Sequence, residues 1–339
     1  MFWDGVAQQA AGLSGGGIEA LVSPPSPAVQ ERRTRLKIGL ALGGGAARGW
    51  SHIGVMRTLI QAGIVPDVIA GCSVGAVVGG CYAADKLDEV EAFARSLTKR
   101  RVMGLLDFHM SGSGLIAGGR LKRLLDQDLG GQRVETLPLR FVTIATELGT
   151  GHEIWLTKGD LISALRASYA LPGVFDPVFF GGRWLMDGAL VNPVPVTAAR
   201  ALGADIVICV NLNGDIKVRG TVIQSHGGDA VDEIAEAVVE GAPRRWALFG
   251  QGRPSDRPVP QAPGITAVMI DAFNITQDRI ARSRLAGDPP DVMIAPKLSA
   301  IGLFEFHRAA ESIDLGRQAT ERVLPDIMEM IQDAAATVA

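Results

Sequence analysis

One serine of the chain lies in the sequence pattern of a nucleophile elbow. The segment Gly71-Cys72-Ser73-Val74-Gly75 fits G-x-S-x-G; a short apolar run at 66–71 predicts a strand before it, and a helix is expected to begin at Val74. In this motif the serine occupies a strained strand-to-helix turn, and the flanking glycines admit neighbouring chain at contact distance. We therefore predict that Ser73 is a nucleophile and that Gly71 and Gly75 shape its turn. A packing turn with an idle serine is the alternative.

A glycine-rich segment, GGGAARG at 43–49, stands between an earlier strand and its helix. Free N–H groups at the start of a helix bind anions, which here could be a nucleotide phosphate or the oxyanion of a tetrahedral acyl intermediate. A dinucleotide fingerprint is not met, because Arg48 occupies the place of its third glycine, and no P-loop lysine follows. The segment precedes Ser73 by one strand-helix step, which favours an oxyanion loop. We expect positive φ angles at Gly44 or Gly45.

A serine nucleophile requires an adjacent base, and the histidines are the first candidates. His307 alone has the late position that an α/β-hydrolase triad demands, but its surroundings, FEFHRAA, are typical of an apolar helix face. For His52, in the first helix, we expect a structural hydrogen bond that holds the glycine-rich segment 43–49, called the glycine loop below. The other histidines are His109, His152 and His226.

Asp187 stands out more than any histidine. It ends an apolar hairpin strand in the segment LMDGA, and the residues that follow it, Gly188 and Ala189, are too small to shield its carboxylate. An acidic side chain in this position can point into a cleft, so Asp187 joins Ser73 as a candidate site residue.

The elements that must position these residues alternate along the chain. Strands are expected over 36–42, 66–71, 140–148, 153–156 and 205–212, with a hairpin over 178–186 that turns at Gly181-Gly182. Helices are expected over 50–60, from Val74, and over 161–170 with Asp160 as the N-cap. Two further helices are expected at the C-terminus, the second beginning at Pro325. Strands followed by glycine turns and helices are typical of a parallel sheet in an α/β fold.

Composition narrows the class of protein. The chain has 339 residues, 47% of them hydrophobic, and a net charge of −3, which together support a folded core. Lys and Arg number 33 against 36 Asp and Glu, so no nucleic-acid partner is expected. The scattered Cys72, Cys81 and Cys209 predict small core residues in a reducing cytoplasm, and neither a zinc site nor disulfides.

Four stretches of the chain differ in character. Residues 1–34 combine prolines with charges and predict a flexible leader that lacks the features of a signal peptide. Residues 35–213 hold the motifs and predict the catalytic domain. Residues 214–264, rich in Gly, Pro, Arg and Asp, predict a mobile insert that could serve as a lid, and 265–339 predict a helical part that completes the domain. No transmembrane helix is expected.

The motifs GGGAARG, GCSVG and DGA, in this order, resemble those of the patatin-like phospholipase family, and RGWSHIGV, ASYALPGVFDPV and DGALVNPVPV resemble its bacterial RssA-type branch. The resemblance covers about residues 36–212, with AGDPPDVMI near 286 as a further match. It implies a three-layer α/β/α fold with a central, mostly parallel sheet, and a dyad in which Ser73 is the nucleophile and Asp187 its base. The oxyanion residues that it implies are Gly43, Gly44, Gly45, Arg48 and Gly49, with the first three as N–H donors and Arg48 as a brace.

The chain is thus expected to be a lipid acyl hydrolase, that is a phospholipase A, a lysophospholipase or a carboxylesterase, working through an acyl-enzyme. Partial burial can raise the pKa of a carboxylate enough for it to act as the base. No cofactor or metal is expected; the expected partners are a lipid or acyl ester and, transiently, a membrane surface, with a cytoplasmic or peripheral membrane location. The alternative is a regulatory or scaffold protein on a patatin-like fold with little turnover. A nucleotide-binding protein is disfavoured by Arg48 and the missing lysine.

Overall fold

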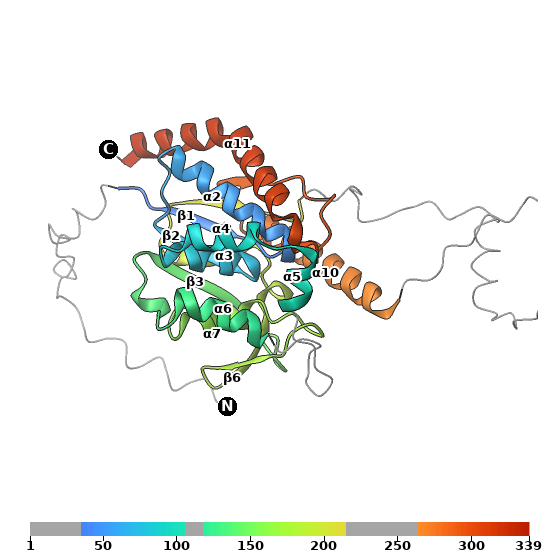
Figure 1. Cartoon of the computed structure of the whole chain (residues 1–339). Coiled ribbons are helices and arrows are strands. Elements are labelled where there is room, and N and C mark those ends of the chain that lie inside the picture. The colour runs from blue at the N-terminus through green and yellow to red at the C-terminus, as the bar shows by residue number, and fades with distance from the viewer. Residues whose placement is uncertain (1–34, 106–117, 215–263, 339) are drawn as a thin grey trace, which may run out of the picture.

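The computed structural model describes residues 35–105, 118–214 and 264–338. The leader predicted for 1–34 lies outside these ranges, as does the insert predicted for 214–264 except for its two end residues. In the described part a central sheet lies between two layers of helices (Figure 1). The three-layer α/β/α architecture and its mostly parallel sheet are therefore confirmed.

The sheet has eight strands in the described part of the chain. They are β1 (Ile38–Leu42), β2 (Val68–Cys72), β3 (Arg140–Glu147), β4 (Glu153–Leu156), β5 (Val178–Phe180), β6 (Arg183–Asp187), β7 (Ile206–Val210) and β8 (Val292–Ile294). The order is β5-β6-β3-β2-β1-β7-β8, and β4 pairs with β3. β1, β2, β3, β7 and β8 run parallel, whereas β4, β5 and β6 are joined by antiparallel pairing. β1, β2 and β7 are apolar along almost their whole length because both of their faces are covered.

Helices cover both faces of this sheet. The α-helices are α2 (Ser51–Gln61), α3 (Val74–Ala83), α4 (Leu87–Arg95), α5 (Lys99–Leu105), α6 (Gly119–Leu129), α7 (Leu161–Ser168), α8 (Val196–Ala201), α10 (Ile265–Gly287) and α11 (Ala309–Val338), and the 3₁₀ turns are η2 (Ala46–Trp50), η3 (Val134–Thr136), η4 (Gly188–Leu190) and η5 (Phe306–Arg308). One core cluster packs α2, α3, α4, α7 and α11 against the sheet and includes Ile53 and Ile313. A second cluster, which includes Val207 and Ala281, packs α8 and α10 against the opposite face.

Three local features predicted from the sequence are present in the structure: the cap of α7, the hairpin turn and the buried cysteines. Asp160 caps α7 by accepting a hydrogen bond from the N–H of Ser163 at 2.8 Å. Gly181 and Gly182 have φ angles of 59° and 79°, as a two-residue hairpin turn requires, and β5 and β6 form the expected hairpin. The cysteines are buried and free.

The C-terminal part differs from its prediction in two respects. α11 continues through Pro325, where the sequence indicates the start of a second helix. Ile313 and Ile327 are buried on either side of the proline and α11 lies along α2, so packing offsets the hydrogen bond that proline cannot donate. In addition, Val292–Ile294 forms β8 beside β7. The sequence does not predict this strand, because an apolar run of three residues is too short to indicate one.

Candidate active site

Two strands that share one edge of β3 bring Ser73 and Asp187 together. β2 pairs with the first part of β3, as far as Cys72 opposite Ile144. β6 pairs with the part that follows, with Asp187 opposite Ala145. Because β4 occupies the other edge of β3 over these same residues, β2 and β6 must lie end to end. Ser73, which directly follows β2, therefore meets the last residue of β6.

Ser73 occupies a turn that close packing of the backbone holds in place. Its φ of 54° and ψ of −123° are strained for a residue with a side chain. The two flanking glycines are required sterically, because a Cβ on Gly71 would collide with the backbone of Ala76 and one on Gly75 with the carbonyl of Leu42. This crowded strand-to-helix turn is the geometry that the sequence predicts for a nucleophile elbow.

The side chains of Ser73 and Asp187 form a buried hydrogen-bonded pair. The Ser73 hydroxyl donates to Oδ2 of Asp187 at 2.7 Å, and the two residues are 8% and 2% exposed. Burial raises the pKa of Asp187 to about 6, against the opposing effect of hydrogen bonds from the N–H of Ala189 and from Ser73. A carboxylate with this pKa is ionised at neutral pH and remains basic enough to take the serine proton. The pair therefore has the chemistry of a nucleophile and its general base.

Backbone and side-chain contacts fix the position of Asp187. Its Oδ1 accepts the N–H of Ala189 at 2.8 Å, and its carbonyl accepts the hydroxyl of Thr146 at 2.8 Å. Its own N–H donates to the carbonyl of Ala170 at 2.9 Å. A Cβ on Gly188 would collide with a carbonyl of β3, so a glycine is required directly after the aspartate. The Asp-Gly-Ala motif thus closes β6 with the carboxylate aimed at Ser73.

The glycine loop lies directly beside the serine. A Cβ on Gly44 would be 3.4 Å from the Cβ of Ser73. The N–H of Gly43 donates to the carbonyl of Val210 at 3.1 Å, and the N–H of Gly44 donates to that of Pro193 at 3.0 Å. Two of the three N–H groups that the resemblance implies as oxyanion donors therefore already donate to backbone carbonyls.

The available donors lie one residue further along the loop. Within the described residues, the N–H groups of Gly45 and Ala46 have no hydrogen-bond partner, and neither has that of Val74 at the start of α3. The positive φ, 48°, falls on Ala46, while the three glycines of the loop lie outside the left-handed region, contrary to expectation. Gly45 and Ala46 are therefore the loop residues whose N–H groups remain available to an oxyanion, because an amide that already donates to a carbonyl cannot stabilise a developing charge.

Arg48 braces the loop against the C-terminal part of the chain. Its Nε donates to the carbonyl of Ile301 at 2.9 Å, and its own carbonyl accepts the hydroxyl of Ser312 at 3.0 Å. A Cβ on Gly49 would collide with the side chain of Val74, so this glycine lets η2 pack against the start of α3. The last two oxyanion-loop residues implied by the sequence thus hold the loop in place.

His52 supports the same loop from α2. It is fully buried, and its Nε2 lies 2.8 Å from the carbonyl oxygen of Gly43, which is the structural hydrogen bond predicted from the sequence. Burial lowers the pKa of His52 to about 4, against the opposing effect of this hydrogen bond. The ring is therefore neutral at neutral pH and carries its proton on Nε2, because a carbonyl can only accept.

Ser168 belongs to the site and was not singled out by the sequence reasoning. Its hydroxyl accepts the N–H of Ser73 at 2.9 Å and donates to the carbonyl of Ile144 at 2.6 Å. It is completely buried at the end of α7. The one signal in the sequence is a small polar residue that falls on the apolar face of α7, whereas the other polar residues of this helix, Ser163 and Arg166, are partly exposed. Ser168 acts through Ser73, and we regard it as a positioning residue.

Ser168→Ala is expected to lower kcat/KM by about tenfold and the free energy of unfolding by about 1–3 kcal/mol, because it leaves the buried N–H of Ser73 unpaired. Ester hydrolysis and chemical denaturation measure the two effects. Ser163→Ala, in the same helix and partly exposed, is the matched control and should change neither. A Ser168→Ala variant that is destabilised but has wild-type kcat/KM would limit the residue to a structural role.

Gly44→Val is expected to lower kcat/KM by about 100-fold or more while the protein still folds. An added Cβ meets Ser73 and Ala189 at 3.4 Å, an ordinary contact, but the further methyl groups of valine fill the space beside the serine. Gly44→Ala is the control and should retain most of the activity. Hydrolysis of a short-chain ester and circular dichroism give the result, and a folded Gly44→Val enzyme with the wild-type rate would contradict it.

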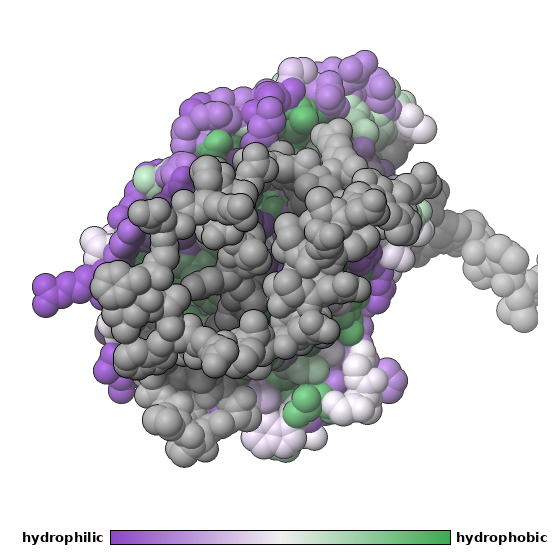
Figure 2. Space-filling model, turned by 90° about the vertical axis from the view of Figure 1, so that its right-hand side faces the viewer, coloured by the Kyte–Doolittle hydropathy of each residue, from purple (hydrophilic) through white to green (hydrophobic). Residues whose placement is uncertain are grey.

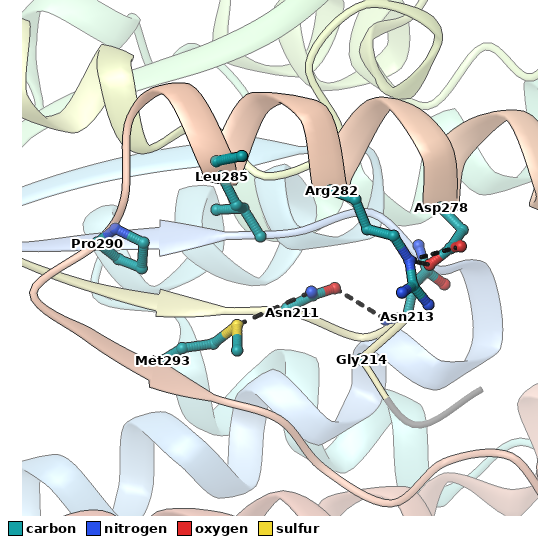
Figure 3. A pocket seen from close by; sticks show the side chains of 9 residues that line it. Asn211, Asn213, Gly214, Asp278, Arg282, Leu285, Pro290 and Met293 are labelled. Atoms are coloured by element: carbon teal, nitrogen blue, oxygen red, sulfur yellow. Dashed lines mark hydrogen bonds and ion pairs between the residues drawn. The ribbon is translucent and has the colours of Figure 1, made fainter. Parts of the chain in front are cut away.

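A separate groove of about 570 Å³ opens where β7 and β8 end beside α10 (Figure 3). It is lined by Asn211, Asn213, Gly214, Asp278, Arg282, Leu285, Ala286, Pro290 and Met293. Leu212, between the two asparagines, faces the glycine loop instead, since a Cβ on Gly45 would lie 2.8 Å from its Cδ1. Neither member of the Ser73–Asp187 pair lines the groove, so the groove is separate from this pair.

The described residues hold neither a candidate metal cluster nor a candidate membrane-spanning helix. No three His, Cys, Asp or Glu side chains within 35–105, 118–214 and 264–338 come together in a way that could hold a metal ion. No helix in these ranges is both long enough and apolar enough to cross a membrane.

Comparisons with known proteins relate the chain to a known family. The family model of patatin-like phospholipases matches residues 40–200. An uncharacterized NTE family protein of Mycobacterium tuberculosis is 33% identical over 93% of this chain and 99% of its own length. The lysophospholipase nte1 of Emericella nidulans is 25% identical over 82% of this chain but only 17% of its own length. The crystal structure of VipD from Legionella pneumophila has a TM-score of 0.48 at 13% identity, over 86% of this chain and 67% of that one.

A serine turn between a parallel strand and a helix, next to a glycine-rich loop, places the chain among the α/β proteins with a nucleophile elbow. Within this class, the chain belongs to the patatin-like phospholipase family. The RssA-type branch inside that family stays a prediction.

Proposed function

We propose that this protein is a serine lipid acyl hydrolase that uses Ser73 and Asp187 as a dyad. The observation that carries the proposal is the 2.7 Å hydrogen bond from the Ser73 hydroxyl to the buried carboxylate of Asp187. The substrate class comes from the relatives, since the family is that of patatin-like phospholipases and one relative is named a lysophospholipase. A phospholipid, a lysophospholipid or a simpler carboxylic ester is therefore the proposed substrate.

The reaction would proceed through an acyl-enzyme. Oγ of Ser73 attacks the ester carbonyl carbon while Asp187 takes the hydroxyl proton. The N–H groups of Gly45 and Ala46 stabilise the negative charge that develops on the carbonyl oxygen. The carbon–oxygen bond to the alcohol then breaks, and Asp187 returns its proton to the leaving oxygen. Water repeats the sequence against the acyl group, which releases the fatty acid and restores Ser73.

A fluorophosphonate probe tests this proposal most directly, because it reacts with an activated serine hydroxyl. We expect a single adduct that mass spectrometry maps to Ser73, and release of fatty acid from lysophosphatidylcholine or phosphatidylcholine by the same preparation. A heat-denatured sample should show no adduct. The regulatory or scaffold alternative predicts a folded protein without labelling, and this result or an adduct on another serine would overturn the proposal.

Hydrolysis should continue in an excess of the chelator EDTA. The nucleophile of the proposed reaction is a serine hydroxyl, which has no need of a metal-bound water. The measurement is the initial rate on a soluble ester before and after chelation. Loss of activity that added calcium or zinc restores would contradict the dyad mechanism.

A further inference from the structure

The hairpin that ends at Asp187 exposes large apolar side chains at its other end. Phe179 and Trp184 face each other across β5 and β6 with ring centroids 5.2 Å apart, and they are 60% and 53% exposed. Leu148, also exposed, donates its N–H to the carbonyl of Trp184 at 2.8 Å. The exposed Trp155 of β4 lies on the same face of the sheet by its register with β3. These four side chains form the hairpin patch.

The hairpin patch lies at the carboxyl edge of the sheet, where the dyad is. Leu185 pairs with Glu147, the last residue of β3, so the start of β6 and its turn extend beyond the parallel strands. Trp184 precedes Asp187 by three residues, which is about 10 Å along a strand. In Figure 2, pale and green residues lie at the lower end of the molecule, at the height where Figure 1 places β6.

The charged side chains around the hairpin patch present their cations outward. Arg183 directly precedes Trp184 and points to the other face of β6 by strand alternation; it pairs with Glu147, and its side chain is 51% exposed against 14% for the glutamate. In the same way, Arg284 is 44% exposed and its partner Glu153 only 17%. A surface that approaches from outside therefore meets basic groups first, while the carboxylates lie beneath them. This arrangement complements a negatively charged surface.

We propose that the hairpin patch docks the protein on an anionic phospholipid bilayer, an inference that rests on the proposed lipid hydrolase function. Tryptophan and phenylalanine are suited to the boundary between headgroups and acyl chains, and basic side chains at the rim bind anionic headgroups. Apolar groups enter such an interface by about 5–10 Å. The hairpin therefore brings Asp187 and Ser73 close to the level at which the ester bonds of a phospholipid lie.

Sedimentation with vesicles of phosphatidylcholine and phosphatidylglycerol in equal parts tests the proposal on the full chain. The variant Phe179→Ala/Trp184→Ala should bind these vesicles about tenfold or more weakly than the wild type, and Arg183→Gln should bind more weakly at low salt. All three proteins should hydrolyse a soluble short-chain ester with equal kcat/KM. Met328→Ala, which removes an exposed apolar side chain from α11 on the upper side of the molecule in Figure 1, is the matched control and should bind normally.

The outcomes separate the docking surface from the chemistry. Equal vesicle binding by the wild type and the double variant overturns the docking inference, and so does a wild type that hydrolyses the soluble ester without binding vesicles. A wild-type dimer in light scattering that the double variant loses, without vesicle binding, assigns the patch to a second copy and also overturns it. Selective loss of vesicle binding in the double variant supports the docking surface, whether or not the protein hydrolyses an ester. Absence of ester hydrolysis by the wild type would reject the proposed function and leave the docking surface standing.

Discussion

Ser73→Ala is expected to lower kcat on any ester by about 10⁶-fold and to abolish labelling by a fluorophosphonate. The size follows from the loss of the nucleophile, whose removal from an enzyme with a covalent intermediate leaves only binding and oxyanion stabilisation. The fold should survive, because the substitution removes one hydroxyl from a turn that backbone packing holds. Burst kinetics and intact-mass analysis measure the acyl-enzyme that the wild type forms and the variant lacks.

Ser73→Gly is the matched variant, because it also lacks the hydroxyl but relieves the backbone. Ser73 has a φ of 54°, which costs a residue with a Cβ about 1–3 kcal/mol and costs glycine little. Both variants should be inactive, and the glycine variant should be the more stable to urea by about 1 kcal/mol after the entropy of the unfolded glycine is counted. Measurable turnover by either variant would remove Ser73 from the mechanism.

The two residues of the proposed dyad could be singled out from the sequence because each lies in a contiguous motif that its local backbone requires. Gly71 and Gly75 follow from the crowding of the elbow, and the turn at Gly181-Gly182 fixes the hairpin that carries Asp187. His52 could be placed beside the loop because it lies in the first turn of α2, the helix that follows the loop. These features are local, so a single segment of sequence contains the information.

The remaining parts of the site depend on pairs of residues that are distant in the chain. The N–H groups of Gly43 and Gly44 already donate to carbonyls only because Val210 and Pro193 come to lie opposite them. The place of Ser168 behind Ser73 depends in the same way on how α7 packs against β3 and α3. Neither relationship can be derived from spacing along the sequence, since each is set by tertiary packing.

Asp187→Asn is expected to lower kcat by about 10³–10⁴-fold, the upper range for loss of a general base. Asparagine keeps the size of the side chain and can still accept the N–H of Ala189, but its amide cannot take the proton of Ser73. In the wild type, the pH profile of kcat/KM should have an acidic limb near pH 6, since burial raises the pKa of Asp187 to about 6. His52→Gln is the matched control: its amide can donate to the carbonyl of Gly43, and the acidic limb should remain.

The same substitution should make the protein more stable above pH 6. The folded-state pKa of Asp187 is raised from 3.8 to about 6, so folding favours the protonated form and wild-type stability falls as the pH rises through this interval. The loss is on the order of 3 kcal/mol above pH 6 and disappears below about pH 4.

Asp187→Asn has no proton to lose, so its free energy of unfolding should exceed that of the wild type at pH 7 to 8 and converge with it near pH 4. His52 is present in both proteins, and its own titration cancels in the difference. Urea denaturation at a series of pH values measures the gap; a gap that does not change with pH would contradict the titration of Asp187. A fully active Asp187→Asn enzyme, together with an inactive but folded histidine variant, would replace the dyad by a triad.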